Sequence, residues 1–396
     1  MRHLRVTLSL TLLFVGLVNI YVVRRGKVFP PATPISQAVP RARFAGPAHQ
    51  EPYAAFGMWE GDVRPGMDKN HESLFLGIET ECSFESGSSC AQKGSREARV
   101  NGLPPLSDHT FEWHDLIGAL CLTHDTFRML ELGAGWAKWI VDAVGLGRAS
   151  GRRVVAIGVE AQPKHCEFAK AHIRNNKAGG QAILICGAVG AEDGFVEMPA
   201  LGNDTSKTNF GYGLQHILDG KRAGLQREGA QILRVPAYSL CTLVHREEFL
   251  GQPVDFVSLD VQSFEYAILK DSPENRRCLD DKVRVLHISM HRMEENDARA
   301  ITTLMVGALG WQLTRYLPLM TSKHPTPFGK VDIVDGRLCF VNRRLAPDFY
   351  APALDDPLMI HRGSYTGTKD PKRPSKSADW GPGDYITDIF PRYHAV

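Results

Sequence analysis

Short apolar runs alternate with stretches of helical periodicity between Thr110 and Arg343. The apolar runs are rich in β-branched residues, which is typical of buried strands. Five runs are Arg128–Leu132, Arg153–Glu160, Ala182–Val189, Val254–Val261 and Val283–Met290, and helices are expected from Ala137, over Lys164–Asn176, from Glu265 and over Glu294–Leu309. This alternation predicts a doubly wound α/β fold, a parallel sheet with helices on both faces. A further run, Arg337–Asn342, is expected to supply the closing edge strand.

The same pattern divides the chain into four segments. Residues 1–27 form a candidate membrane anchor, 28–109 a Pro-rich stem with an irregular pre-domain segment, 110–345 the α/β domain, and 346–396 an irregular tail. The stem has many Pro and Ala residues and little apolar periodicity, as an extended linker does.

The anchor is predicted from the uncharged run Val6–Val23, which has basic residues on both sides. About 20 apolar residues cross a bilayer as a helix, so the run is just long enough for one transmembrane helix. It ends in Tyr-Val-Val-Arg-Arg and lacks a small-residue cleavage site, which favours an uncleaved signal-anchor over a signal peptide. The two flanks are similarly basic, so the positive-inside rule does not decide the orientation.

Charge and cysteine content narrow the function classes. Lys and Arg number 46 against 44 Asp and Glu, and no basic run is long enough to follow nucleic acid. Eight cysteines without a C-x-x-C pair indicate neither a disulfide scaffold nor a zinc site, and no metal ion is expected. Cys82 and Cys90 are the pair expected to form a disulfide if the compartment is oxidising. Five of the other six cysteines lie beside apolar runs and are expected to be buried thiols, namely Cys121, Cys166, Cys186, Cys241 and Cys339.

The first chemical signal is a glycine-rich loop between the first strand and its helix. Glu131-Leu-Gly133-Ala-Gly135 fills this turn. Glycines let the backbone approach a ligand, and the helix N-terminus that follows offers unpaired N–H groups. We expect Glu131, Gly133 and Gly135 to bind a cofactor, although an ordinary strand-to-helix turn is the alternative.

The second strand ends in Glu160, followed by Ala161. In doubly wound folds an acid at this strand end accepts hydrogen bonds from a ribose diol, so both residues are expected at the cofactor. NAD and S-adenosyl-L-methionine both carry such a ribose. Lys138 stands where a dinucleotide loop has its third glycine, which favours S-adenosyl-L-methionine.

Two further strand ends supply candidate residues. Ala188 and Val189, at the end of the third strand, are expected to hold an adenine ring, and a simple hairpin turn is an equal alternative. Asp260 ends the fourth strand and His291 follows the fifth. Because ligands of open α/β sheets bind beyond these ends, both are expected to be catalytic, Asp260 also touching the cofactor and His291 acting as a base or orienting group. A structural role is the alternative for His291 and the favoured one for His287.

The order of these motifs, from about Met129 to His291, resembles that of FkbM-type methyltransferases. The resemblance implies that residues 110–345 form a Rossmann-like methyltransferase domain. It further implies that S-adenosyl-L-methionine donates a methyl group to a hydroxyl of a sugar or other small acceptor. Gln262 and Ser263 replace the Glu-Gly of the family's fourth motif, and Ser289 replaces its fifth-strand acid, which weakens the case for a catalytic base.

Two other classes stay open, an NAD-type oxidoreductase and an inactive cofactor-binding module. The order of anchor and stem favours a domain in a secretory lumen (Golgi or ER), where Asn203-Asp-Thr205 is a glycosylation sequon. The basic residues after the anchor favour the opposite orientation. Acceptor and oligomeric state do not follow from these patterns.

Overall fold

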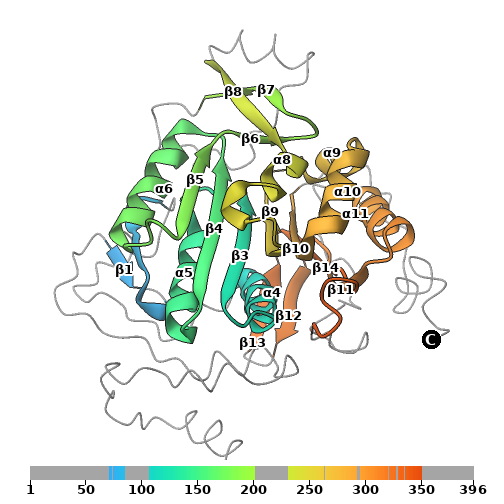
Figure 1. The fold of residues 1–396 in the computed structure, drawn as a ribbon, viewed down its shortest axis with the longest axis horizontal. Helices are drawn as coiled ribbons and strands as arrows, with labels where there is room; N and C mark the ends of the chain where they lie inside the picture. The colour runs from blue at the N-terminus through green and yellow to red at the C-terminus, as the bar shows by residue number, and fades with distance from the viewer. Residues whose placement is uncertain are drawn as a thin grey trace, which may run out of the picture. The chain divides into compact units, whose positions relative to one another are not determined.

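The computed structural model describes residues 71–73, 75–84, 107–200, 231–262, 264–291, 295–319, 321–326, 329–333 and 335–349. A seven-stranded sheet has the order β5-β4-β3-β9-β10-β14-β11 (Figure 1). Its strands are β3 (Thr126–Leu132), β4 (Arg153–Glu160), β5 (Ala182–Cys186), β9 (Val254–Leu259), β10 (Val283–Met290), β11 (Gln312–Leu317) and β14 (Gly336–Val341). The first five in spatial order are parallel, and β14 runs antiparallel to both of its neighbours.

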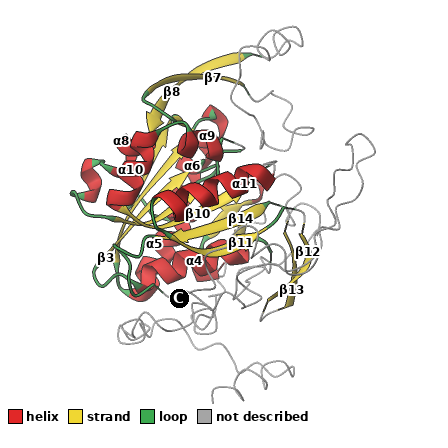
Figure 2. Cartoon of the chain, turned by 90° about the vertical axis from the view of Figure 1, so that its right-hand side faces the viewer, coloured by secondary structure: helices red, strands yellow, loops and turns green. Residues whose placement is uncertain are grey.

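Helices cover both faces of this sheet, as Figure 2 shows for α4 and α5 on one side and α10 and α11 on the other. Met129 and Phe256 pack in the core beneath α4 and α5, while Leu130 and Val257 pack in the opposite core. This separation follows from the two-residue period of a strand. The first face carries α4 (His109–Cys121), α5 (Lys138–Ser150) and α6 (Pro163–Asn175), and the second carries α8 (Leu240–Val244), α9 (Glu265–Lys270), α10 (Pro273–Lys282) and α11 (Glu295–Thr302), which continues as a π-helix (Thr303–Ala308). The predicted doubly wound fold is confirmed.

One predicted strand position is wrong. The run Arg337–Asn342 was expected at the sheet edge, but β14 lies between β10 and β11, so β11 is the edge strand. β11 was not predicted from the sequence, because two of its buried residues, Thr314 and Arg315, are polar and interrupt the apolar pattern.

The third predicted run divides at Gly187. β5 stays in the main sheet, whereas β6 (Ala188–Gly190) joins β8 (Ile232–Ser239) and β7 (Gly194–Pro199) in a three-stranded sheet. A side chain at Gly187 would come within 2.6 Å of the Tyr238 ring. The small sheet therefore starts at the carboxyl edge of the main sheet, where β5 ends.

Ordered structure begins before Thr110, which corrects the expectation of an irregular segment at 28–109. β1 (His71–Ser73) pairs with β2 (Glu79–Glu81). Asn176, at the end of α6, donates to the carbonyl of Glu79 and accepts from its N–H, both at 2.8 Å. These bonds fix β2 to the domain.

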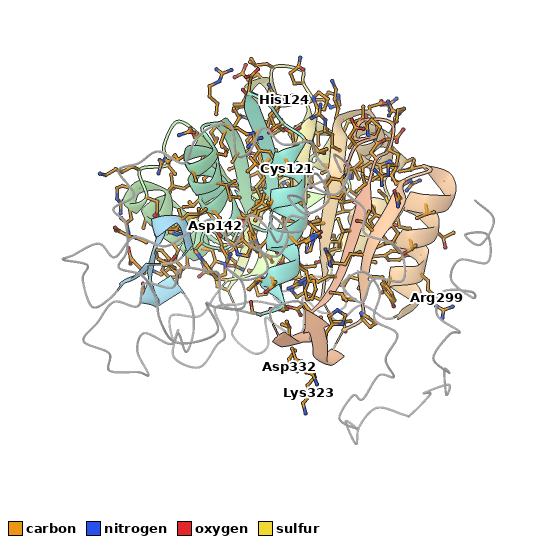
Figure 3. All side chains as sticks on the ribbon, turned by 90° about the horizontal axis from the view of Figure 1, so that it is seen from below. Cys121, His124, Asp142, Arg299, Lys323 and Asp332 are labelled. Atoms are coloured by element: carbon orange, nitrogen blue, oxygen red, sulfur yellow. A yellow bond between two sulfur atoms is a disulfide. The ribbon has the colours of Figure 1, made fainter. Side chains whose placement is uncertain are left out.

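A second hairpin, β12 (Thr321–Thr326) with β13 (Gly329–Ile333), follows β11. The backbone N–H of Lys323 donates to Asp332 across this hairpin (2.8 Å), and Figure 3 labels both residues. The hairpin returns the chain to β14, next to the end of β10.

The cysteine prediction is wrong in its main point. Cys166 forms a disulfide with Cys186 (Cα–Cα 6.0 Å), and Cys241 forms one with Cys278 (Cα–Cα 5.1 Å). Each bridge joins elements that the fold brings together, so neither was visible from local composition. The predicted partner Cys90 lies outside the described residues.

Several other predictions lie outside them as well, namely the anchor at 1–27, most of the stem, the sequon at Asn203 and the tail beyond 349. Within the part of the chain that is described, no helix has both the length and the apolar character needed to cross a membrane.

Candidate active site

The carboxyl edge of the sheet collects most of the predicted site residues. The glycine loop follows β3, Glu160 ends β4, Asp260 follows β9 and His291 follows β10. β3, β9 and β10 are neighbours, and the connections diverge on either side of β3. Such a switch point is where open α/β sheets bind ligands.

The glycine loop is held tightly against the end of β9. Gly133 has φ +84°, and a Cβ on it would lie 1.7 Å from the carbonyl oxygen of Asp260. The N–H of Asp260 in turn donates to the carbonyl of Leu132 (2.8 Å). Only glycine combines this left-handed backbone with so close a contact. Ala137, which closes the loop, also has a left-handed backbone (φ 63°).

Glu131 lies beneath this loop and is 2% exposed. Its two oxygens accept hydrogen bonds from the N–H groups of Trp139 (3.1 Å) and Ile140 (3.0 Å), in the first turn of α5. Burial raises the pKa of this carboxyl well above its usual value, although the two backbone donors oppose the shift. Glu131 thus positions the loop and the start of α5, and its predicted direct contact with a cofactor stays a prediction.

Glu160 joins the loop to the end of β4. Its Oε2 accepts from the N–H of Gly135 (2.8 Å), and its Oε1 accepts from the N–H of Gln162 (2.7 Å). The side chain is buried, with His165 Nδ1 3.5 Å from Oε1. A carboxylate oxygen accepts more than one hydrogen bond, so this arrangement leaves Glu160 able to accept from a hydroxyl as well.

The residues predicted to hold an adenine ring lie beside Glu160. Ala188 is buried in a small cluster against which Ala161 packs. Val189 is buried in the core on the other face of the sheet. β6 therefore presents small apolar residues at this end of the sheet.

A polar cluster occupies the ends of β9 and β10. His291 Nδ1 lies 3.3 Å from Glu265 Oε1, and its Nε2 lies 3.5 Å from Asp260 Oδ1 and 3.3 Å from Asp335 Oδ2. Gln262 Nε2 is 3.0 Å from both Asp260 Oδ1 and His291 Nε2. The structure thus brings the two predicted catalytic residues, Asp260 and His291, into one cluster.

This environment bears on the predicted role of His291. Burial alone would lower the pKa of His291, but the nearby carboxylates of Asp260, Asp335 and Glu265 raise it to about 11. A group that keeps its proton at neutral pH is a poor general base. The arrangement therefore favours the orienting role over the predicted role as base.

Sequence reasoning missed Asp335 and Glu112. Asp335 stands in an Asp-Gly turn before β14, a signal that indicates a turn and no chemistry. Glu112 of α4 is buried and accepts a hydrogen bond from the Ser258 hydroxyl of β9. Burial raises the pKa of Glu112.

His287 has the structural role that the sequence favoured. It is fully buried, and its Nδ1 lies 2.8 Å from Asp115 of α4. Ser289, on the same side of β10, is also buried, which puts it below the crevice and away from any acceptor. His287, Ser289 and His291 lie on the same side, and since the first two are buried, His291 is the one of the three that reaches the crevice.

Comparison with known proteins gives one curated relative and several distant structures. No family model matches the chain. A protein of Jannaschia sp. (strain CCS1), described as a "Putative methyltransferase", is 25% identical over 182 residues, which are 44% of this chain and 62% of that protein. The chain thus spans less than two thirds of this relative.

Two solved structures illustrate the distant similarity. Methyltransferase FkbM from Methylobacillus flagellatus KT is 13% identical with a TM-score of 0.33, covering 55% of this chain and 45% of that one. Magnesium protoporphyrin IX methyltransferase from Synechocystis PCC 6803, with bound S-adenosylmethionine, is 15% identical with a TM-score of 0.31, covering 59% and 76%. Likenesses of this size carry no inference here.

Proposed function

We propose that this chain is an S-adenosyl-L-methionine-dependent methyltransferase that modifies a hydroxyl oxygen of a sugar or other small acceptor. The observation that carries the proposal is the bond between the Gly135 N–H and the Glu160 carboxylate (2.8 Å). It joins a glycine loop and a strand-end acid at the switch point of the sheet, where a ribose-bearing cofactor is bound in doubly wound folds. The curated relative from Jannaschia supports the same class.

The loop supports S-adenosyl-L-methionine over NAD. A dinucleotide loop needs glycine at its third position for close helix packing. Here Lys138 occupies that position, with its ammonium 3.5 Å from the centre of the Trp139 ring and 2.8 Å from Asp142. The two backbone N–H groups that a pyrophosphate would use at this helix start are bonded to Glu131.

The site residues fit the adenosine and methionine parts of the cofactor. In this proposal Glu160 binds the ribose, Ala161, Ala188 and the backbone of Val189 lie against the adenine ring, and the backbone at Gly133 and Gly135 lies against the methionine part. The buried Ala188, with the partly buried Ala161 packed against the same small cluster, suits a flat apolar ring. The cofactor would supply an activated methyl group on a sulfonium.

Transfer to oxygen requires that the acceptor be held in line with that methyl group, and proximity alone accounts for a large share of such rates. Asp260 is partly exposed, with 29% of its side chain accessible, and is the carboxylate best placed to meet an acceptor hydroxyl. His291 orients Asp260 from the inner side of the cluster. In this proposal Asp260 is the catalytic residue and His291 is a positioning residue.

Cofactor choice is tested by calorimetric titration of the full chain in detergent with S-adenosylhomocysteine and, separately, with NAD. We expect S-adenosylhomocysteine to bind and NAD not to bind. Glu160→Gln removes a charged acceptor and should weaken binding about 10- to 100-fold. The matched control is Glu167→Gln, an exposed acid on α6. Binding of NAD alone, or unchanged S-adenosylhomocysteine affinity in Glu160→Gln, would overturn the assignment.

Transfer itself is tested with labelled S-adenosyl-L-methionine against a panel of glycans and small hydroxyl acceptors. Label incorporation into one acceptor, reduced in Asp260→Asn, is the expected result. If S-adenosylhomocysteine binds normally and no acceptor is labelled in any class, the chain is an inactive cofactor-binding module, and the transferase proposal fails.

We also propose that residues 1–27 anchor the protein and that its domain faces a secretory lumen. The disulfides Cys166–Cys186 and Cys241–Cys278 support this, because such bridges persist in oxidising compartments. Protease added to sealed vesicles should leave the domain intact and digest it once detergent is added. Digestion without detergent would reverse the orientation.

A further inference from the structure

The cluster around His291 contains a set of potential metal ligands. Ligand atoms of Asp260, Glu265 and His291 all lie within 4.8 Å of one another. They come from three places, the end of β9, the start of α9 and the end of β10. Donor atoms bound to one ion at about 2.0–2.2 Å lie roughly 3 Å apart. His291 Nε2 lies 3.5 Å from Asp260 Oδ1 and 3.3 Å from Asp335 Oδ2, close to this value, whereas Glu265 Oε1 lies 3.3 Å from the other ring nitrogen, Nδ1.

Each arrangement of hydrogen bonds in this cluster leaves two like groups in contact. The Gln262 amide nitrogen lies 3.0 Å from both Asp260 Oδ1 and His291 Nε2. If Nε2 of His291 carries a proton, two donors face each other at 3.0 Å. If the amide is turned, its oxygen faces the ionised Asp260 oxygen at the same distance.

The remaining choice also leaves a repulsive contact. If Nε2 carries no proton, it accepts from the Gln262 amide (3.0 Å), but its lone pair also faces the carboxylate oxygens of Asp335 at 3.3 Å and Asp260 at 3.5 Å. Two acceptors do not bond without a hydrogen or a cation between them. Among ionised carboxylates, each of these proton placements therefore leaves at least one contact between like groups at Nε2 or at the Gln262 amide.

A second observation comes from Glu265. The side chain is 0% exposed, and its Oε2 has no hydrogen-bond partner among the described residues. Its Oε1 accepts from the Val261 N–H (3.0 Å) and lies beside His291 Nδ1. A buried carboxylate oxygen without a partner is costly and needs an explanation such as an ion.

We propose that Asp260, Glu265 and His291 bind one divalent cation, with the Gln262 amide oxygen turned toward it and Asp335 balancing its charge. The cation displaces the proton from one ring nitrogen of His291 and lies between that nitrogen and the carboxylates of Asp260 and Glu265, where its positive charge replaces the contacts between like groups. Oxygen donors with one imidazole suit Mn²⁺ or Mg²⁺ better than a thiolate-preferring ion. If the proposed function holds, the ion lies where it orients an acceptor oxygen, but cation binding itself does not depend on that function.

The test uses the full chain after EDTA treatment and removal of the chelator, with MnCl₂ as the probe and no cofactor present. Electron paramagnetic resonance of free Mn²⁺ should report one bound ion per chain. Glu265→Gln and His291→Gln should each weaken binding by at least about 10- to 100-fold. Glu274→Gln, an exposed acid on α10, is the matched control and should bind Mn²⁺ as the unaltered chain does.

A second measurement covers variants that fold poorly. Mn²⁺ should raise the thermal midpoint of the unaltered chain, since a ligand that binds only the folded state stabilises it. It should leave the midpoint of Glu265→Gln unchanged. Absence of bound Mn²⁺ at millimolar concentration, or equal affinity in all variants, would overturn the inference. The S-adenosylhomocysteine titration described above is independent, so either proposal can fail while the other stands.

Discussion

Gly133 and Asp260 touch through their backbones, so closely that a methyl group on Gly133 would lie 1.7 Å from the Asp260 carbonyl oxygen. This contact sets the distance between the loop after β3 and the end of β9. The cofactor side and the acceptor side of the proposed site therefore share one rigid junction.

Gly133→Ala should break this junction. We expect a loss of about 2–5 kcal/mol in the free energy of unfolding, from left-handed backbone strain plus displacement of Asp260. Gly180→Ala is the matched control, because Gly180 has a similar φ of +83° with nothing within 4 Å of the added methyl. It should lose only about 1–2 kcal/mol, the strain alone. Urea unfolding measures both, and equal losses would show that the contact with Asp260 is unimportant.

The buried pair Asp115–Arg315 should be a major source of stability. Arg315 Nη2 lies 2.9 Å from Asp115 Oδ1, and both side chains are at most 2% exposed. Burial alone would raise the pKa of Asp115, but Arg315, His114 and His287 hold it well below its usual value. The pair connects the edge strand β11 to α4.

Arg315→Met should cost about 3–5 kcal/mol in unfolding free energy, because it leaves a buried carboxylate without its cation. Arg277→Met, which removes an exposed pair with Glu274 on α10, should cost at most about 1 kcal/mol. Chemical denaturation of both variants checks this. A small loss in Arg315→Met would mean that His114 and His287 compensate Asp115.

The parallel strands of this fold can be predicted from the sequence, because each of them contains a run of apolar residues. Val254–Leu259 is wholly buried, and its run of apolar residues predicts this directly. The edge strand β11 cannot be predicted in this way, because the burial of Arg315 depends on a carboxylate 200 positions earlier in the chain. β7 and β8 are likewise unmarked, because they pair with each other and with β6 across a long connection.

The candidate site shows the same division. Glycine spacing and strand ends predicted the positions of Gly133, Glu160, Asp260 and His291. The direction in which a carboxylate turns could not be predicted, because Glu131 bonds to helix N–H groups eight and nine positions later. Asp335 was missed because its place beside His291 depends on β14 lying next to β10.

The disulfide Cys241–Cys278, which connects α8 to α10 with a separation of 37 residues, should stabilise the domain. Loop-closure entropy predicts a loss of about 3–4 kcal/mol in the double variant Cys241→Ser/Cys278→Ser. Cys121→Ser is the control, since Cys121 is a free cysteine at the end of α4 (Figure 3). Urea unfolding with and without reductant measures the effect. If reductant leaves the unfolding midpoint of the unaltered chain where it was, the bridge does not contribute.

His172 should make the domain sensitive to acid. It is 1% exposed, its Nδ1 lies 3.0 Å from the Trp136 carbonyl, and its Nε2 lies 3.3 Å from the Thr80 hydroxyl. Burial lowers its pKa to about 4, and the charge of Lys138 adds to this, while the hydrogen bond to Trp136 opposes it. The histidine of the unfolded chain has an ordinary pKa near 6.5. Between pH 6.5 and 4 the unfolded chain therefore binds a proton that the folded chain does not bind.

Because the folded pKa is the lower one, this contribution is complete above pH 6.5 and is lost as the pH falls toward 4. The loss should reach about 3 kcal/mol in unfolding free energy. His172→Gln should flatten the stability profile between pH 6.5 and 4, whatever its effect at pH 7. His124→Gln changes an exposed histidine, labelled in Figure 3, and should leave the slope unchanged. Urea midpoints measured across this range distinguish the two variants. An unaltered slope in His172→Gln would assign the acid sensitivity to other groups.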